Sequence, residues 1–320
     1  MKFAAKVRKK IFIFARIKGL LSTYFILNTN LSYNINVKGR LIDLGAPQVM
    51  GILNVTPDSF YSGSRKQTDE DITERVRQII DEGGTMIDIG AYSSRPGADN
   101  VSEQEEMQRL SHGMRLLRAV SPDIPVSVDT FRASVAKMAV EELGADIIND
   151  ISGGELDKDM MATVAKLQVP YILMHMKVQS DSKADNSSFS RQNMQQTPHY
   201  DHLMKEIMMY FAEKVQRLRD LGQKDIILDP GFGFSKTLEH NYELLCHMEE
   251  LQLFNLPVLS GISRKSMIYK LLGTSPDEAL NGTTVLNTIS LQKGASILRV
   301  HDVREAVETV RIVQAMRQNQ

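Results

Sequence analysis

The sequence predicts an α/β fold, an eight-stranded (β/α)8 barrel in which parallel strands alternate with helices. Three features carry this prediction: eight short apolar runs, an amphipathic stretch after each run, and a polar residue or loop where each run ends. Continuous short apolar runs are typical of parallel strands that are buried on both faces. A chain of 320 residues is long enough to hold eight such units in one domain.

The apolar runs and the amphipathic stretches follow one another in strict alternation. The strands are expected at 49–53, 86–89, 126–128, 147–148, 171–174, 226–228, 257–259 and 297–300. The helices are expected at 69–82, 103–120, 133–143, 159–167, 200–221, 241–253, 282–293 and 303–314, with a further helix starting at Ser266. An open doubly wound sheet is the competing architecture, but no Gly-x-Gly-x-x-Gly motif follows the first strand. Eight regular units favour the closed barrel.

Two segments precede the barrel. Residues 1–32 form a basic extension, rich in Lys and Arg and without Asp or Glu. Its apolar residues recur every three or four positions, so it is either an amphipathic anchor or targeting segment, or a dispensable extension translated from an upstream start. Residues 34–44 alternate in polarity around Lys38-Gly39, which predicts a β-hairpin that plugs the bottom of the barrel. The barrel domain is therefore expected to span 33–320.

Composition excludes several classes of protein. A formal net charge of −1 gives no general attraction to nucleic acid or to acidic membranes. No apolar run approaches the roughly 20 residues of a membrane-spanning helix, so stable membrane insertion is not expected. The single cysteine, Cys246, rules out an internal disulfide.

The long polar loop at 177–199 is expected to be disordered or partly ordered, with a lid as the alternative.

Polar residues at the predicted strand ends point to one site. In barrels of this class the chemistry lies at the carboxyl ends of the strands. Asp129, Asn149 and Asp229 end the third, fourth and sixth strands, and together they suit a flat heterocycle with a guanidine-like edge. A metal cluster is the other specific reading, although no His-rich spacing supports zinc. Each Asp alone could equally be a helix cap or a salt-bridge partner.

Positive charge gathers after the last two strands. Arg264, Lys265, Arg299 and His301 lie where barrels often bind phosphate, and Ser266 begins a helix whose free N–H groups favour an anion. Arg299 can also stack on an aromatic ring. For His301 the alternative is a packed side chain beside an Asp302 helix cap.

Eight segments together resemble the dihydropteroate synthases, a family of pterin-binding barrels. They are MGILNVTPDSF at 50–60, SRPG at 94–97, SVDT at 127–130, IND at 148–150, LMHM at 173–176, LDPGFGF at 228–234, SRKS at 263–266 and RVHD at 299–302. Each segment is moderately specific, and the set in this order is very specific.

The resemblance implies a reaction and a set of site residues. The reaction joins 6-hydroxymethyl-7,8-dihydropterin diphosphate to 4-aminobenzoate and releases diphosphate, in tetrahydrofolate biosynthesis. By resemblance, the residues that hold the pterin are Asp129, Asn149, Asp229 and Lys265, with Met174 lining its pocket. The diphosphate is expected to contact Arg299 and His301, and a Mg²⁺ ion is expected at Asn54. The residues expected in the aminobenzoate pocket are Ser94, Arg95, Pro96, Phe234, Lys265 and Ser266. Asp129, Lys265, Arg299 and His301 are the expected catalytic residues. The family also suggests a cytoplasmic homodimer that sulfonamides target.

The chain departs from the family pattern at four positions. Ser94 stands where Thr is common, Tyr92 where Glu is common, Ser62 where Asp is common, and Ser235 where Gly is common. Two alternatives share the pterin pocket: a methyltetrahydrofolate–corrinoid methyltransferase and a catalytically degenerate paralogue. The methyltransferase has no need of SRPG at 94–97 or of the Arg299–His301 pair, and the intact set of matching positions argues against the degenerate paralogue.

Overall fold

The computed structural model describes residues 33–56, 69–92, 101–177 and 199–319. Its centre is an eight-stranded parallel sheet in the order β8-β7-β6-β5-β4-β3-β10-β9. The strands are β3 (Gln48–Asn54), β4 (Met86–Gly90), β5 (Val126–Asp129), β6 (Ile147–Asp150), β7 (Tyr171–Met174), β8 (Ile226–Asp229), β9 (Leu259–Ser260) and β10 (Ile297–Val300). A parallel bridge between Leu228 and Val258 joins the two outer strands, which closes the barrel.

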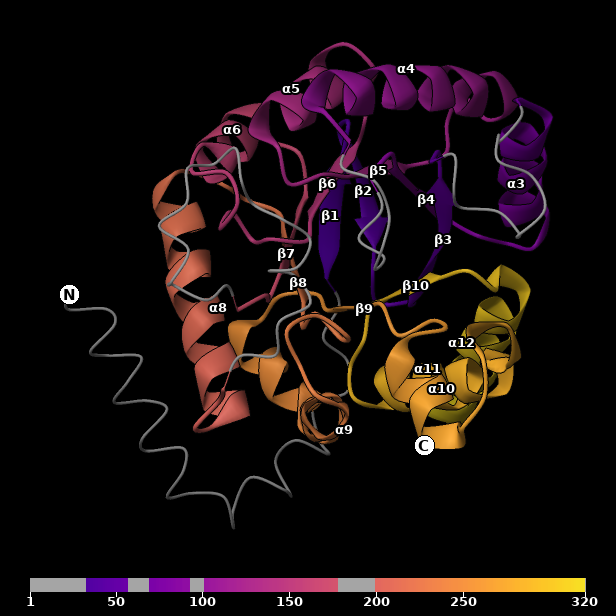
Figure 1. Ribbon diagram of the computed structural model, residues 1–320, viewed down its shortest axis with the longest axis vertical. Helices are drawn as coiled ribbons and strands as arrows, with labels where there is room; N and C mark the ends of the chain where they lie inside the picture. Colours follow the sequence, from indigo (N-terminus) through magenta and orange to yellow (C-terminus); the bar gives the residue numbers. More distant parts are fainter. Residues whose placement is uncertain (1–32, 57–68, 93–100, 178–198, 320) are drawn as a thin grey trace.

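Helices surround the strands as an outer ring (Figure 1). They are α3 (Asp69–Asp81), α4 (Glu103–Val120), α5 (Ala133–Glu141), α6 (Met160–Leu167), α8 (Leu203–Asp220), α9 (Leu238–Cys246), α10 (Ser266–Leu272), α11 (Leu280–Gln292) and α12 (Val303–Gln318), with short 3-10 helices η1 (Met248–Phe254) and η2 (Pro276–Glu278). The barrel prediction is confirmed. The basic extension at 1–32 and most of the polar loop at 177–199 lie outside the described residues.

Helix boundaries follow the capping chemistry. α4 begins as expected, because the Ser102 hydroxyl accepts a hydrogen bond from the Glu105 amide and acidic residues fill the first turn. The stretch expected as one helix at 241–253 is instead two. Thr237 and His240 form a capping box that starts α9 at Leu238, and the chain then tightens into η1 after His247.

The N-terminal hairpin of β1 (Asn34–Val37) and β2 (Arg40–Asp43) is present, as the alternating pattern predicted. Ile35, Val37 and Leu44 pack against a layer of inward-facing barrel side chains and are almost fully buried. That layer contains Met50, Met86, Ile147, Ile172, Ile227, Leu259 and Ile297. The hairpin and this layer together form an apolar floor at the amino ends of the strands, in the middle of the ring (Figure 1).

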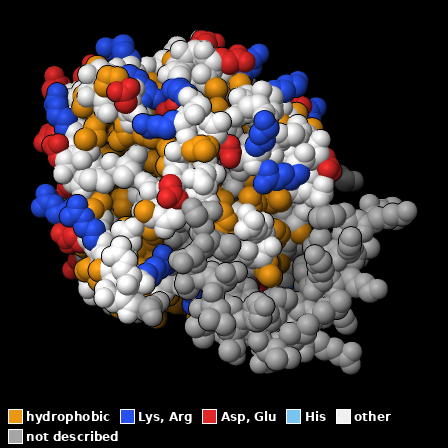
Figure 2. All heavy atoms as spheres, turned by 180° about the vertical axis from the view of Figure 1, so that it is seen from behind, with side chains coloured by type: hydrophobic (Ala, Val, Ile, Leu, Met, Phe, Trp, Pro, Cys, Tyr) orange, Lys and Arg blue, Asp and Glu red, His pale blue; other side chains and the backbone are white. Residues whose placement is uncertain are grey.

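A second, larger apolar cluster fills the space between the strands and the helices. In the described parts of the chain, no helix has the length and hydropathy needed to cross a membrane. On the face shown in Figure 2, Lys and Arg are interspersed with Asp and Glu between hydrophobic patches. This mixed surface agrees with the near-zero net charge.

Candidate active site

The polar residues of the barrel interior lie one layer above its apolar floor. Side chains alternate along a strand, so residues two positions apart face the same side. Ile147, Ile227 and Ile297 belong to the floor. Two positions further along their strands come Asn149, Asp229 and Arg299. The register of the strands therefore brings these polar groups together inside the barrel, towards the carboxyl ends.

Arg299 lies at the centre of this layer. Its Nε donates to Asp88 Oδ2 at 2.6 Å, and its Nη2 donates to Asp129 Oδ2 at 3.0 Å. Asn149 Nδ2 also donates to Asp88 Oδ2, at 3.1 Å. Four side chains from four strands thus form one hydrogen-bonded network in which a single guanidinium serves two carboxylates.

Asp88 is the member of this network that sequence reasoning missed. It lies within the apolar run at 86–89, which was predicted only as a strand. It is fully buried, and its Oδ1 has no hydrogen-bond partner among the described residues. A carboxylate inside an otherwise apolar strand was the available signal, because a buried charge is retained only where it is paired or serves a ligand.

Asp229 and Lys265 approach one another on the other side of the barrel. A Cβ placed on Gly261 would lie 3.9 Å from Lys265 Nζ and 4.0 Å from Asp229 Oδ2. Lys265 donates to the Phe232 carbonyl, and its ammonium lies 4.6 Å from the centre of the Phe234 ring. Met174 is almost fully buried and belongs to the same small apolar cluster as Phe234. The structure thus places a carboxylate, an ammonium and an apolar wall together.

Burial moves the pKa values of Asp129 and Lys265 towards neutrality, whereas Arg299 keeps a high pKa. Burial raises the pKa of Asp129 to about 7, although Arg299 opposes that rise. Burial lowers the pKa of Lys265 to about 8, with Asp229 acting in the opposite direction. Burial also works against the charge on Arg299, but Asp88 and Asp129 outweigh it and raise its pKa. Arg299 therefore stays charged at any physiological pH.

His301 is held from two sides. Ser263 Oγ accepts from the His301 amide at 3.1 Å and lies 3.1 Å from His301 Nδ1. A hydroxyl that already accepts one bond can donate its proton to Nδ1, which favours the tautomer protonated at Nε2. Arg75 Nη2 donates to the His301 carbonyl at 2.6 Å. The ring is thereby oriented through its Nδ1 side and through the backbone on both sides of its Cα.

Arg264 contributes less to this site than the sequence suggested. It forms a bidentate pair with Asp302, at 2.9 and 2.7 Å, and also donates to two carbonyls near η2. Asp302 precedes α12 but makes no side-chain cap there. Of the four basic residues expected after the last two strands, Arg264 has its charge balanced within the fold by Asp302.

Asn54 ends β3 close to Asp129. A Cβ placed on Gly90 would lie 3.7 Å from Asn54 Oδ1 and 3.8 Å from Asp129 Oδ2, so both oxygens flank this glycine. In the described ranges, no three His, Cys, Asp or Glu side chains are grouped to hold a metal ion. The Asn54 amide oxygen and the Asp129 carboxylate are the two oxygen donors that flank Gly90.

Some predicted site residues lie outside the described residues: Ser94, Arg95 and Pro96, together with the departure at Ser62. Ser266 is the first residue of α10, as expected. Tyr92 packs edge-to-face on Phe131, with ring centres 5.1 Å apart, and the Arg132 guanidinium lies 5.6 Å from the Tyr92 ring. The aromatic residue found in place of the common Glu is therefore packed into a local cluster.

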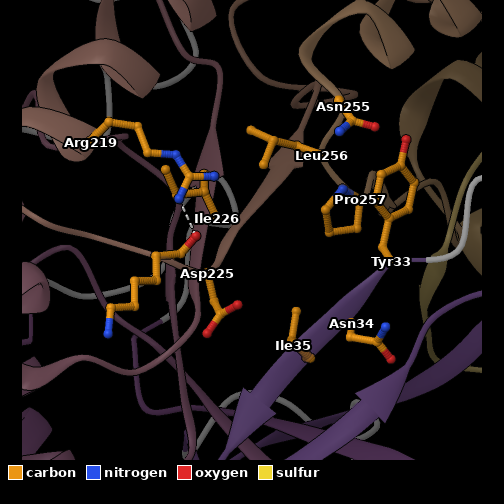
Figure 3. A pocket seen from close by; sticks show the side chains of 10 residues that line it. Tyr33, Asn34, Ile35, Arg219, Asp225, Ile226, Asn255, Leu256 and Pro257 are labelled. Carbon is orange, nitrogen blue, oxygen red and sulfur yellow. Dashed lines mark hydrogen bonds between the residues drawn. The ribbon is translucent and has the colours of Figure 1, made fainter.

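A separate pocket of about 210 Å³ lies near the hairpin, at the opposite end of the barrel (Figure 3). It is lined by Tyr33, Asn34, Ile35, Arg219, Lys224, Asp225, Ile226, Asn255, Leu256 and Pro257. None of the network residues described above lines it, and it is distinct from the site.

A closed parallel barrel with a charged layer at its carboxyl ends defines a (β/α)8 enzyme. The family model described as "Pterin binding enzyme" matches residues 50–301. The dihydropteroate synthase of Escherichia coli (strain K12) is 41% identical over 282 residues, which cover 87% of this chain and 94% of that protein. The chain belongs to the pterin-binding enzymes, within the branch formed by the dihydropteroate synthases.

Solved structures agree with this assignment. A Yersinia pestis dihydropteroate synthase in a sulfonamide drug complex superposes with a TM-score of 0.79 at 40% identity, covering 90% of this chain and all of that one. The Xanthomonas albilineans enzyme in complex with 7,8-dihydropteroate gives a TM-score of 0.76 at 33% identity, covering 89% and 99% of the two chains.

Proposed function

We propose that the protein is a dihydropteroate synthase, a transferase that joins 6-hydroxymethyl-7,8-dihydropterin diphosphate to 4-aminobenzoate in tetrahydrofolate biosynthesis. The observation that carries this proposal is the polar layer around Arg299, in which Asp129, Asn149 and Arg299 belong to segments that resemble the family. The products are 7,8-dihydropteroate and diphosphate.

The pterin ring fits the polar layer by its hydrogen-bonding pattern. Its guanidine-like edge presents parallel N–H donors, and a carboxylate accepts two such bonds. Asp229 and Asp129 are the proposed acceptors, Asn149 can both donate and accept, and Lys265 donates to ring acceptors. Met174 supplies an apolar contact for the ring face. These roles place the ring flat in the barrel mouth, above the apolar floor.

The reaction forms a carbon–nitrogen bond and breaks a carbon–oxygen bond. The diphosphate leaves with the bonding electron pair, so negative charge grows on oxygen while the methylene carbon becomes electron-poor. Arg299 and His301 stabilise the leaving group, and the pterin held by carboxylates spreads the positive charge. An arylamine is nucleophilic near neutral pH and loses its proton after attack, so positioning replaces a strong base.

The second substrate is proposed to lie against Phe234, Lys265 and the start of α10 at Ser266, with Ser94, Arg95 and Pro96 completing the pocket. The Phe234 ring offers a stacking surface for an aromatic amine. The ammonium of Lys265 lies over this ring and is available to both substrates.

A Mg²⁺ ion suits the oxygen donors near Asn54. Mg²⁺ usually binds through one or two protein oxygens and completes its shell with substrate phosphates and water. The amide oxygen of Asn54 and the neighbouring Asp129 carboxylate match this preference. When bound, the ion would neutralise charge on the departing diphosphate.

Turnover is expected to need Mg²⁺. We expect excess chelator to lower the rate of product formation by at least about 100-fold, since a metal stabilises leaving-group charge by several kcal/mol. The measurement is the steady-state rate with chelator, followed by titration of Mg²⁺ back into the same sample. Full rates in chelator would contradict the role given to Asn54.

The reaction class is tested by diphosphate release. We expect release from the pterin diphosphate to depend on 4-aminobenzoate and to match dihydropteroate formation one to one. Release without the amine would indicate hydrolysis, and tight pterin binding without any release would favour a catalytically degenerate paralogue.

A homodimer in the cytoplasm is the proposed state of the protein. Leu271, Leu272, Val285, Ile312 and Met316 are large apolar residues that remain exposed. They lie on α10, α11 and α12, which pack in sequence on one side of the ring (Figure 1). A second copy covering this side would remove these side chains from water.

A further inference from the structure

A buried lysine beside the site has no part in the mechanism above. Lys236 is 8% exposed and follows the turn at 230–235, here named the β8 turn. Its ammonium donates to the carbonyls of Gly231 at 3.0 Å and Phe234 at 3.1 Å, and lies 3.0 Å from His175 Nδ1. An ammonium has three donors, and here each has an acceptor.

The carbonyls of Gly231 and Phe234, which accept from Lys236, lie at the two ends of one part of the β8 turn. Gly231 and Phe234 are the ends of a tight turn, closed by the Phe234 amide donating to the Gly231 carbonyl at 3.2 Å. The Asp229 carboxylate accepts from the Gly231 amide at 2.7 Å. Lys236 therefore contacts the turn that connects the proposed pterin ligand to the ring that walls the second pocket.

The β8 turn is held in a conformation that ordinary residues avoid. Gly231, Gly233 and Ser235 all have positive φ, at 71°, 79° and 46°. A Cβ on Gly231 would lie 2.1 Å from the His175 carbonyl, so the turn is pressed against the end of β7. Such a conformation persists only where surrounding contacts determine it.

Ser235 supplies a second contact to β7 that a glycine at this position would lack. Its hydroxyl accepts from the Lys177 amide at 2.9 Å, and the Tyr200 hydroxyl donates to its carbonyl at 3.1 Å. The hydrogen bond from the Lys177 amide to the Ser235 hydroxyl offsets part of the strain of a non-glycine residue at positive φ. The β8 turn and the end of β7 are thus joined through two side chains, Lys236 and Ser235.

The charges around this junction fix the role of His175. Burial lowers the pKa of His175 well below its usual value, and the ammonium groups of Lys236 and Lys177 add to the effect. A neutral imidazole can accept at Nδ1 while its proton stays on Nε2. Burial lowers the pKa of Lys236 to about 7; Asp229 opposes this fall, and Lys265 adds to it.

We propose that Lys236 is a positioning residue for the second substrate, because its ammonium joins His175 to the carbonyls of Gly231 and Phe234 and so fixes the Phe234 ring beside Lys265. This inference rests on the proposed function. It assigns the contact with substrate to Phe234, and to Lys236 only the conformation of the turn.

The test replaces Lys236 by methionine, which keeps the length of the side chain and removes the three donors. We expect KM for 4-aminobenzoate to rise about tenfold or more, while KM for the pterin diphosphate changes less than about threefold. Lys214→Met is the matched control, because Lys214 is also 8% exposed but pairs with Glu155 and lies against the Tyr210 ring, at 5.5 Å, rather than against the β8 turn. That control should leave both KM values near those of the wild type.

A second pair of variants separates positioning from general stability. His175→Asn retains an acceptor near the Nδ1 position and should behave like the wild type, whereas His175→Leu should raise KM for the amine in the same sense as Lys236→Met. If Lys236→Met does not fold, the contrast between the two His175 variants decides the proposal. Equal changes in the two KM values, or identical behaviour of His175→Asn and His175→Leu, would overturn it.

A readout without substrate distinguishes failure of this inference from failure of the proposed function. Amide hydrogen exchange across 230–235 should be faster in Lys236→Met than in the wild type, and unchanged in Lys214→Met. Unchanged exchange would show that Lys236 does not hold the turn, whatever reaction the enzyme performs. If the wild-type protein is inactive but exchange is faster in Lys236→Met, the proposed synthase function is wrong and the role of Lys236 in holding the β8 turn still stands.

Discussion

Asp129→Ala is expected to lower kcat/KM by about 10³-fold or more while the barrel stays folded. Asp129 is both a proposed pterin ligand and a partner of the Arg299 guanidinium, at 3.0 Å. Removing one member of a buried, hydrogen-bonded charge pair costs about 2–5 kcal/mol. The fold should survive because Arg299 keeps its shorter contact with Asp88, at 2.6 Å.

The measurement is steady-state turnover, with thermal unfolding as the control for folding. Asp129→Asn retains the shape and one acceptor, so it should lie between the wild type and the alanine variant. Near-normal synthesis by Asp129→Ala would contradict the placement of the pterin in the polar layer.

Arg299→Met is expected to lose activity to a similar degree and to lose stability as well. Asp88 is fully buried, and its contacts are to Arg299 and Asn149. Removing the guanidinium leaves a buried carboxylate without its cation, which costs about 3–5 kcal/mol. The free energy of unfolding, measured in urea, should fall by about this amount.

A double variant separates the two losses. Arg299→Met with Asp88→Asn removes the unpaired buried charge, so most of the lost stability should return. Activity should not return, because the leaving diphosphate still lacks its cation. Wild-type stability in the single variant, or restored turnover in the double variant, would show that the network is not organised around Arg299.

Many strand ends and helix bounds could be predicted from the sequence, because the local signals, such as apolar runs and helix caps, agree with how the strands and helices pack. The strand ends at Asp129, Asn149 and Asp229 were predicted, since a polar residue directly after an apolar run marks the edge of a parallel sheet. α4 was predicted residue for residue because its cap and its apolar period agree. The boundaries that shifted, such as the start of α9, depended on a His in the capping box where Glu or Gln is usual.

The parts that could not be predicted depend on pairings across the barrel. Asp88 lies within a short apolar strand, and only the register of β4 against β5, and of β5 against β6, shows that it faces the interior network. Arg264 follows β9 and Arg299 lies in the neighbouring strand β10, yet Arg264 pairs with Asp302 whereas Arg299 reaches the site. The destination of a long side chain depends on its partners, which sequence spacing does not specify.

The hairpin floor has a consequence for the order of events in a catalytic cycle. Ile35, Val37 and Leu44 close the amino end of the barrel with side chains that are at most 5% exposed. Substrates and products must then exchange through a single mouth. If the pterin lies in the polar layer and the arylamine lies against Phe234, as proposed, we expect the pterin diphosphate to enter first and the arylamine to hinder its escape. An activated pterin would then be committed to coupling once its acceptor has arrived.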